Sequence, residues 1–237
     1  MLAGYFHKSV PANNPNFDHS SKIDDIFEKA LIESIPDFID GLITFPKTKR
    51  LDEEEFSQEF VISLNRNLLH NPKGILAVPE YKDLDTVGAN PVKRVDIAFV
   101  SSEQGASKIK LYTVEAKRLP TGTGKREKEY IYGHFASGSP AGGIQRFKTE
   151  DHAYGLSKSA LLGYIEKKEF TYWFTTINSW ISDKANELTD WNTNEQLQHL
   201  EVSSCGHFSV SRSTANRSSD SINLFHLWIK IPLLSNY

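Results

Sequence analysis

The sequence predicts an α/β or α+β fold in which helices flank a mixed central β-sheet. Apolar residues recur at helical spacing through residues 22–68, which indicates helices. Short runs rich in β-branched and apolar residues follow in residues 74–116, which indicates strands. We expect a single domain over residues 22–237, preceded by an arm over residues 1–21 that is rich in Asn, Pro and Ser.

Two helices are expected before the first strand. The first covers residues 22–39, and Pro36 is expected to kink or end it because proline lacks the backbone donor. The second begins after Asp52, a suitable N-cap whose capping-box partner is Glu55, three residues further on. Its apolar side chains recur every four residues, at Phe56, Phe60, Leu64 and Leu68.

Three strands are expected next, over residues 74–80, 91–100 and 108–116. The second and third should form a hairpin, because residues 101–107 between them have the composition of a turn. Residues 120–143 are rich in Gly, Ser and Lys, and we interpret most of them as a mobile loop.

The rest of the chain, from residue 141 onward, alternates between helical and extended signals. The expected elements are helices over 141–148 and 156–166, a buried strand over 170–177, two short helices over 180–200, an irregular Ser-rich segment over 203–221 and a closing strand over 224–231. The two expected strands are rich in aromatic and β-branched residues, which favours extended structure.

The composition excludes several classes of protein. With 39% hydrophobic and 24% charged residues the chain resembles ordinary globular proteins, and a single cysteine, Cys205, excludes an intrachain disulfide framework. The most apolar stretch, residues 224–234, is interrupted by His226 and Lys230 and is too short to span a bilayer. Residues 1–16 hold no apolar run of signal-peptide length, so we expect a cytoplasmic protein with no membrane contact.

Charge is unevenly distributed along a chain whose net charge is −3. Residues 108–148 contain nine basic and three acidic side chains, whereas residues 21–60 contain eleven acidic and five basic ones. A polyanion would be attracted to the first segment and repelled by most of the second. The alternative is that the two segments form two solvated faces of opposite sign.

Asp96, Glu115 and Lys117 form a constellation that could carry chemistry. Asp96 lies within one expected strand, and Glu115 and Lys117 lie in its hairpin partner. Residues two apart in a strand share a face, so Glu115 and Lys117 point together. Carboxylates that converge from neighbouring strands suit Mg²⁺, which prefers a few carboxylate oxygens and retained waters. In the alternative interpretation Asp96 pairs with Lys93 or Arg94, and Glu115 and Lys117 form a solvated strand end.

This pattern resembles the signature of the PD-(D/E)xK nuclease superfamily. Val95-Asp96, then eighteen residues, then Glu115-Ala116-Lys117 matches the order of that signature, with Val95 in place of its proline. The resemblance implies a restriction-endonuclease-like fold. It also implies that an acidic residue near the start of the preceding helix completes the metal shell, and Glu53 holds that position.

A second resemblance lies downstream. Residues 143–147 followed by residues 162–165 resemble the helical segment after the active-site strand in nucleases of bacterial defence systems. A Gln or a basic residue at this point can orient a phosphate or the attacking water, which implies that role for Gln145, with Arg146 behind it. The resemblance as a whole covers residues 53–177.

The resemblance implies a metal-dependent nuclease with Mg²⁺ or Mn²⁺ as its cofactor. Asp96, Glu115 and the carbonyl of Ala116 would hold the metal, with support from Glu53, and Lys117 would act on the attacking water or the phosphate. The basic residues expected to hold the nucleic-acid backbone are Lys125, Arg126, Lys128 and Arg146.

The expected substrate is nucleic acid, with DNA favoured over RNA. The resemblance implies that the chain is the effector subunit of a prokaryotic anti-phage defence system. Since no recognition or motor segment is visible, we expect it to work with a partner subunit or as a homodimer. The alternative from another class is a catalytically inactive nuclease-fold scaffold that binds nucleic acid or a partner protein.

Overall fold

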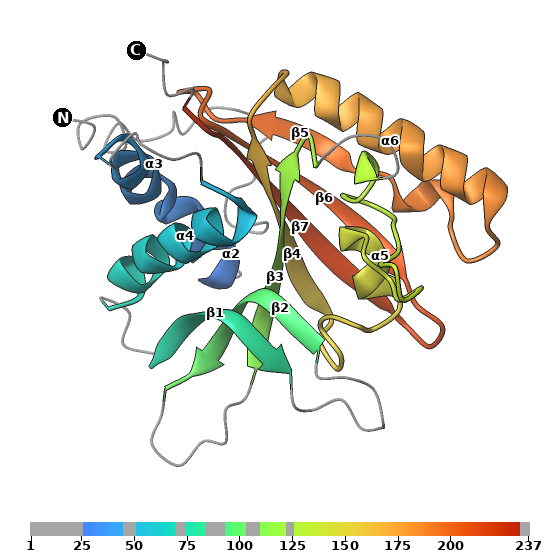
Figure 1. Cartoon of the computed structure of the whole chain (residues 1–237), viewed down its shortest axis with the longest axis horizontal. Helices are drawn as coiled ribbons and strands as arrows, with labels where there is room; N and C mark the ends of the chain where they lie inside the picture. The colour runs from blue at the N-terminus through green and yellow to red at the C-terminus, as the bar shows by residue number, and fades with distance from the viewer. Residues whose placement is uncertain are drawn as a thin grey trace.

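The computed structural model describes residues 26–44, 51–69, 74–83, 93–102, 110–121 and 126–232. These residues form a seven-stranded sheet with helices on both faces (Figure 1). The strand order across the sheet is β1-β2-β3-β4-β7-β6-β5. β4 pairs in parallel with β3 and β7, and the other neighbouring pairs are antiparallel. The expected class, a mixed sheet flanked by helices, is therefore confirmed.

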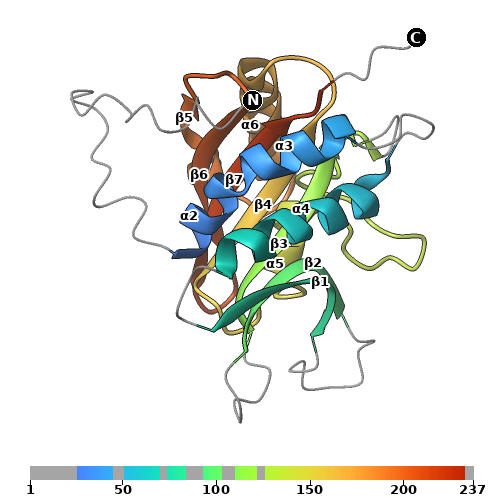
Figure 2. The same ribbon diagram turned by 90° about the vertical axis from the view of Figure 1, so that its left-hand side faces the viewer.

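The helices divide between the two faces of the sheet. The strands are β1 Ile75–Asp83, β2 Lys93–Ser101, β3 Lys110–Leu119, β4 Lys158–Ile165, β5 Gln198–Val202, β6 Phe208–Asn216 and β7 Ser221–Lys230. The helices are α2 Ile26–Glu33, α3 Ile35–Thr44, α4 Glu53–Leu68, α5 Gly143–Lys148, α6 Phe170–Glu187 and the 3₁₀ helix η2 Thr193–Glu195. α2, α3 and α4 cover one face, and α5 and α6 cover the other (Figures 1 and 2). No described helix has both the length and the apolar character needed to cross a bilayer.

The sheet separates two hydrophobic cores. On the side of α2–α4, Phe60 packs in the same cluster as Val114 of β3. On the other side, Ile177 of α6 shares a cluster with Leu161 of β4 and Trp228 of β7. Each of these side chains is almost or completely buried. Burial of one such side chain stabilises the fold by about 1.5–3 kcal/mol, so the sheet is held rigidly from both sides.

The first expected helix is divided into two, α2 and α3. The break falls at Ser34, whose hydroxyl donates to the carbonyl of Ala30 at 2.7 Å. Pro36 lies in the first turn of α3. A proline is tolerated there because the first backbone N–H groups of a helix have no partner within the helix. The expected break near Pro36 is therefore present, and it falls two residues earlier, at Ser34.

The expected N-terminus of α4 is confirmed in detail. Asp52 Oδ1 accepts a hydrogen bond from the N–H of Glu55 at 2.9 Å, and Glu55 Oε2 accepts one from the N–H of Asp52 at 2.9 Å. This capping box satisfies two backbone donors and fixes the point at which α4 begins. The four apolar side chains predicted for the inner face are all buried.

The three expected strands of the middle region are confirmed as β1, β2 and β3. β2 and β3 form the expected antiparallel pair, with Ile97 opposite Val114. Residues 103–109, which join them, lie outside the described residues. Asn65 of α4 ties the helix to β1, because its side chain donates to the carbonyl of Ala77 and accepts from its N–H, each at 2.9 Å.

Two expected elements were assigned to the wrong type. Residues 158–165, expected as helix, form β4, and residues 170–177, expected as strand, form the first half of α6. β4 is a central strand that is buried on both faces. The sequence of such a strand is a continuous apolar run without alternation. The spacing of its apolar residues therefore does not distinguish it from a buried helix. α6 buries Phe170, Trp173 and Ile177 at helical spacing, so packing prevails over its β-rich composition.

Two segments expected to be irregular or mobile are ordered. Within residues 203–221, the strand β6 pairs with both β5 and β7. Its serines alternate with other residues and point to a buried face, which is a strand pattern. The expected mobile loop over residues 120–143 is also wrong for its described part, because Tyr130 and Ile131 are fully buried. The region expected as two short helices contains the end of α6, η2 and β5.

A buried chain of polar side chains crosses the second core. The indole of Trp228 donates to the hydroxyl of Tyr130 at 2.8 Å, and that hydroxyl lies 2.9 Å from Nδ1 of His226. Nε2 of His226 lies 2.8 Å from the hydroxyl of Ser213. Burial, and then the charge of Arg212, lower the pKa of His226 to about 3, so the imidazole is neutral in the folded protein at neutral pH.

This lowered pKa predicts a specific loss of stability in acid. An unfolded histidine takes up its proton near pH 6.5, whereas folded His226 resists protonation until about pH 3. The folded state is therefore favoured above the unfolded pKa and loses this advantage as the pH falls. We expect His226 alone to lower the free energy of unfolding by about 2 kcal/mol between about pH 7.5 and about pH 5.

Urea unfolding of the wild type and of His226→Gln across this interval measures the effect. Glutamine can fill the site but does not titrate. The free energy of unfolding of the variant should therefore depend less steeply on pH than that of the wild type. Parallel profiles for the two proteins would contradict the assignment.

Candidate active site

β2 and β3 separate at the position of Asp96. Backbone pairing between the two strands ends at Ile97 and Val114. Continuing the register by one residue would place Asp96 opposite Glu115. The N–H of Ala116 donates to Asp96 Oδ2 at 2.6 Å, so a side chain replaces a backbone acceptor. The strands diverge here while β3 continues along β4.

Lys117 links the carboxylates of this region. Its Nζ lies 2.8 Å from Glu115 Oε1 and 3.3 Å from Glu53 Oε1, and it donates to the carbonyl of Ala116 at 2.9 Å. Burial lowers the pKa of Lys117, but Glu115, Glu53 and Asp96 outweigh burial and raise this pKa above its ordinary value. Lys117 is therefore held as an ammonium ion.

Glu53 approaches the site from α4, as expected for a residue in its first turn. Glu53 Oε2 accepts a hydrogen bond from the N–H of Arg118 at 2.9 Å, and Oε1 faces Lys117. The carboxylate thus fastens the start of α4 to the end of β3. With its side chain 34% exposed, it retains contact with solvent.

Glu115 is fully buried and is surrounded by cations. Its Oε1 accepts from Nη1 of Arg146 at 2.6 Å and faces Lys117, and its Oε2 lies 3.0 Å from Nδ1 of His152. Burial raises the pKa of Glu115, but Lys117, His152 and Arg146 together hold it well below the ordinary value. Glu115 is therefore ionised in the fold.

The pKa of Asp96 is shifted in the opposite direction to that of Glu115. Burial is the largest cause that raises its pKa well above the ordinary value, and the negative charge of Glu115 adds to it. Lys117 and the hydrogen bond from Ala116 act in the other direction without cancelling the rise. Two neighbouring carboxyl groups with opposed shifts are characteristic of functional sites.

The two residues predicted on α5 have different environments. Arg146 reaches Glu115 and so belongs to the carboxylate cluster. Gln145 is buried, and its Oε1 accepts from the N–H of Gly133 at 3.1 Å, while its Nε2 lies 3.4 Å from Nε2 of His134. The structure therefore brings Arg146 to the site, and gives Gln145 a contact with the preceding loop.

The basic residues predicted to hold nucleic acid are largely paired with acids. Arg126 lies 2.9 Å from Glu129, and Lys128 lies 3.2 Å from Asp183. The pKa of Arg126 is raised, chiefly by Glu129 and to a smaller extent by Glu53. Lys125 lies outside the described residues.

Sequence reasoning missed two residues of the site, His152 and Arg217. His152 is buried against Glu115. The guanidinium of Arg217 donates to three carbonyls in the segment around His152, those of Phe147, Ala153 and Leu156, at 2.9–3.1 Å. It thereby holds the turn that carries His152. No spacing in the sequence links β6 to this turn, and the contact follows from the fold alone.

The donor set has the chemistry of a site for a hard divalent cation. Three carboxylates, from Glu53, Asp96 and Glu115, lie around Lys117, and Arg146 contacts Glu115. Carboxylate oxygens are the ligands that Mg²⁺ prefers. Within the described ranges, no three His, Cys, Asp or Glu side chains already form a metal-binding group. A metal would therefore have to compete with the cations that contact Glu115.

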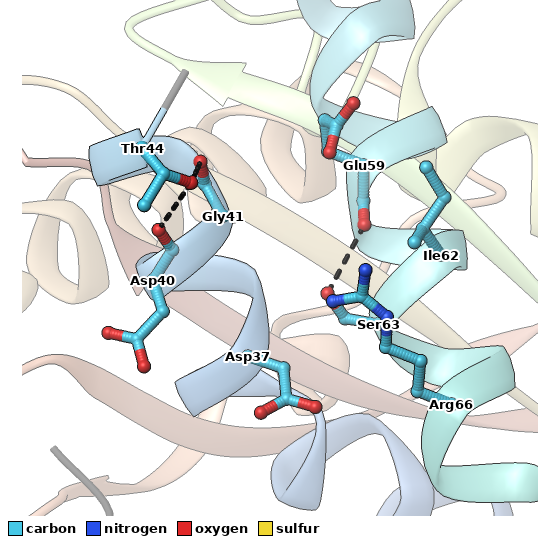
Figure 3. A pocket seen from close by; sticks show the side chains of 8 residues that line it. All are labelled: Asp37, Asp40, Gly41, Thr44, Glu59, Ile62, Ser63 and Arg66. Atoms are coloured by element: carbon cyan, nitrogen blue, oxygen red, sulfur yellow. Dashed lines mark hydrogen bonds between the residues drawn. The ribbon is translucent and has the colours of Figure 1, made fainter. Parts of the chain in front are cut away.

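A separate hollow lies between α3 and α4, away from these carboxylates (Figure 3). Its lining is Asp37, Asp40, Gly41, Thr44, Glu59, Ile62, Ser63 and Arg66. Three acids against one arginine make the hollow unfavourable for phosphate groups. This agrees with the excess of acidic residues in residues 21–60 of the sequence.

Comparison of the chain with protein-family models, with curated proteins and with solved structures gave no match.

The opposed pKa shifts predict opposite effects of two neutralising substitutions. Asp96→Asn removes a charge that burial and Glu115 disfavour, and the amide oxygen can still accept from Ala116. We therefore expect it to raise the free energy of unfolding in EDTA by on the order of 1 kcal/mol. Glu115→Gln removes the buried carboxylate that faces Arg146 and one of the two that face Lys117, so it should lower that free energy by about 3 kcal/mol.

Urea unfolding of both variants at neutral pH checks the pair. Destabilisation by both substitutions to a similar degree would show that Asp96 serves packing rather than sitting in an unfavourable charge environment.

Proposed function

We propose that this chain is a metal-dependent nuclease of the PD-(D/E)xK type that hydrolyses phosphodiester bonds, with DNA preferred to RNA. One observation carries the proposal. Asp96 and Glu115 lie across the opening between β2 and β3, and the ammonium of Lys117 is held between Glu115 and Glu53. Paired carboxylates beside a fixed cation supply what phosphodiester hydrolysis requires.

The residues divide between holding the metal and acting on the phosphate. Asp96, Glu115 and the carbonyl of Ala116 would hold Mg²⁺ or Mn²⁺, with Glu53 in support. The bound metal would lower the pKa of a water and neutralise charge on the phosphate. Lys117, held as an ammonium, would donate hydrogen bonds to the phosphate as negative charge gathers on it.

Arg146 is suited to a second task at the same place. Its guanidinium contacts Glu115 and is 16% exposed. A guanidinium can exchange a carboxylate for a phosphate, because both acceptors match its planar donors. We propose that Arg146 contacts the phosphate when Glu115 turns to the metal.

The wider role rests on the resemblance of residues 143–147 and 162–165 to a segment of nucleases of bacterial defence systems. We propose that the chain acts in the cytoplasm as the effector subunit of an anti-phage system. A partner subunit or a second copy of the chain would supply recognition of the target.

A second candidate is a nuclease-fold scaffold without catalysis. The observation that favours it is that Oε1 of Glu115 faces both Lys117 and Arg146, while Oε2 lies 3.0 Å from Nδ1 of His152. If these contacts persist in the presence of Mg²⁺, the carboxylate has no free oxygen for a metal. Such a protein would bind nucleic acid or a partner and leave the phosphodiester bond intact.

Cleavage by the Lys117→Met variant tests the proposed function. Methionine keeps most of the side-chain volume but removes the ammonium that would act on the reacting phosphate. Single-turnover cleavage of labelled DNA and of labelled RNA in Mg²⁺ should fall by on the order of a hundredfold to a thousandfold. Mg²⁺ binding measured by calorimetry should persist, because the carboxylates remain.

Lys29→Met is the matched control, since Lys29 is an exposed lysine of α2 paired with Glu33. It should cleave at the wild-type rate. The proposal fails if the wild type cuts neither nucleic acid in Mg²⁺ or Mn²⁺, or if Lys117→Met remains fully active. The first outcome would favour the scaffold.

A further inference from the structure

An exposed aromatic ring is held beside the carboxylate cluster. Phe135 is 51% exposed and lies in the turn that precedes α5. Its N–H donates to the carbonyl of Ser139 and its carbonyl accepts from the N–H of Gly138, each at 2.9 Å. Gly138 has a φ of +85°, a conformation that favours glycine and closes this turn. The backbone that carries the ring is therefore fixed, although the ring is exposed.

The turn is fastened to α5 at its base. The N–H of Ala141 donates to the carbonyl of Gly133 at 2.9 Å, and Gln145 accepts from the N–H of Gly133. Gly142 packs closely against the backbone of Tyr132. A Cβ atom on residue 142 would lie 2.3 Å from the Cα atom of Tyr132. These contacts join the turn and α5 into one unit, which explains why Gln145 is buried.

Arg146 connects the exposed ring to the proposed site. Its Cζ lies 5.1 Å from the centroid of the Phe135 ring, and its Nη1 lies 2.6 Å from Glu115 Oε1. Ring, guanidinium and carboxylate therefore form a continuous row. Single exposed apolar side chains are common on proteins. This one is distinguished by its fixed backbone and by its place one side chain away from Glu115.

We propose that Phe135 is a stacking platform for an unstacked nucleobase, so that the site takes single-stranded nucleic acid or an opened duplex end. This inference rests on the proposed function and narrows its substrate. In a duplex the flat faces of the bases are covered by their neighbours, whereas an unstacked base exposes a face that an aromatic ring can cover. With a base on Phe135, Arg146, whose guanidinium lies beside the same ring, would be placed to contact the adjoining phosphate.

Binding without cleavage tests the inference. Single-stranded DNA, single-stranded RNA and duplex DNA of matched length are titrated in EDTA, with fluorescence anisotropy as the readout. Phe135→Ala should weaken binding of single strands by about tenfold to a hundredfold and leave duplex binding unchanged. A 2-aminopurine base in the strand should be quenched by the wild type and not by Phe135→Ala. Comparison of the DNA and RNA arms shows which strand is preferred.

Two further variants separate stacking from packing. Phe135→Leu keeps an apolar side chain without a flat ring and should bind as weakly as Phe135→Ala, whereas Phe135→Trp should restore binding and quenching. Tyr172→Ala is the control, because Tyr172 is 46% exposed and has Lys168 at 5.3 Å, but lies on α6. It should bind as the wild type does.

The inference is overturned if the wild type does not bind single strands, if Phe135→Ala binds them normally, or if Phe135→Leu restores binding. A cleavage assay on the same oligonucleotides keeps the two proposals apart. Cleavage that is unaffected by Phe135→Ala would remove the inference and leave the nuclease. Absence of cleavage with base stacking intact would remove the nuclease and leave a binding site for single strands.

Discussion

A fully buried carboxylate, that of Glu115, must be neutralised within the fold, because an unpaired ion in an apolar interior costs several kcal/mol. Its compensating groups come from three places in the chain: Lys117 on β3, Arg146 on α5, and His152 in the turn after α5. Arg217 is buried and donates to the carbonyls of Phe147 and Ala153, which lie on either side of His152. Asp96 by contrast has a raised pKa, because burial is the largest influence on it and the charge of Glu115 adds to burial.

The charge balance explains how several buried ionisable groups can lie together in one cluster. Lys117 is shared between Glu115 and Glu53, so it is fixed in position without being neutralised by a single partner. Asp96 lies where β2 leaves β3, so its carboxylate is bound to a backbone N–H rather than to a cation. A divalent cation would relieve the repulsion between Asp96 and Glu115. The rigid sheet, covered by a core on each side, keeps the two strand positions opposed.

The sequence was most informative where local chemistry determines structure. The capping box of Asp52 and the alternation around Asp96 depend on neighbouring residues, and the start of α4 and the β2–β3 hairpin were predicted correctly. β4 and α6 were exchanged in type because both are buried by tertiary packing, which hides their periods. His152 could not be found, because its contact with Glu115 depends on Arg217, some sixty residues further along the chain.

The central claim is that Asp96 and Glu115 together hold a divalent cation, and anomalous diffraction from crystals grown with Mn²⁺ tests it most directly. We expect an anomalous peak in contact with both carboxylates and with the carbonyl of Ala116. We also expect the guanidinium of Arg146 to have moved away from Glu115. A structure in which Arg146 and Lys117 still contact Glu115, with no peak beside Asp96 at saturating Mn²⁺, would contradict it.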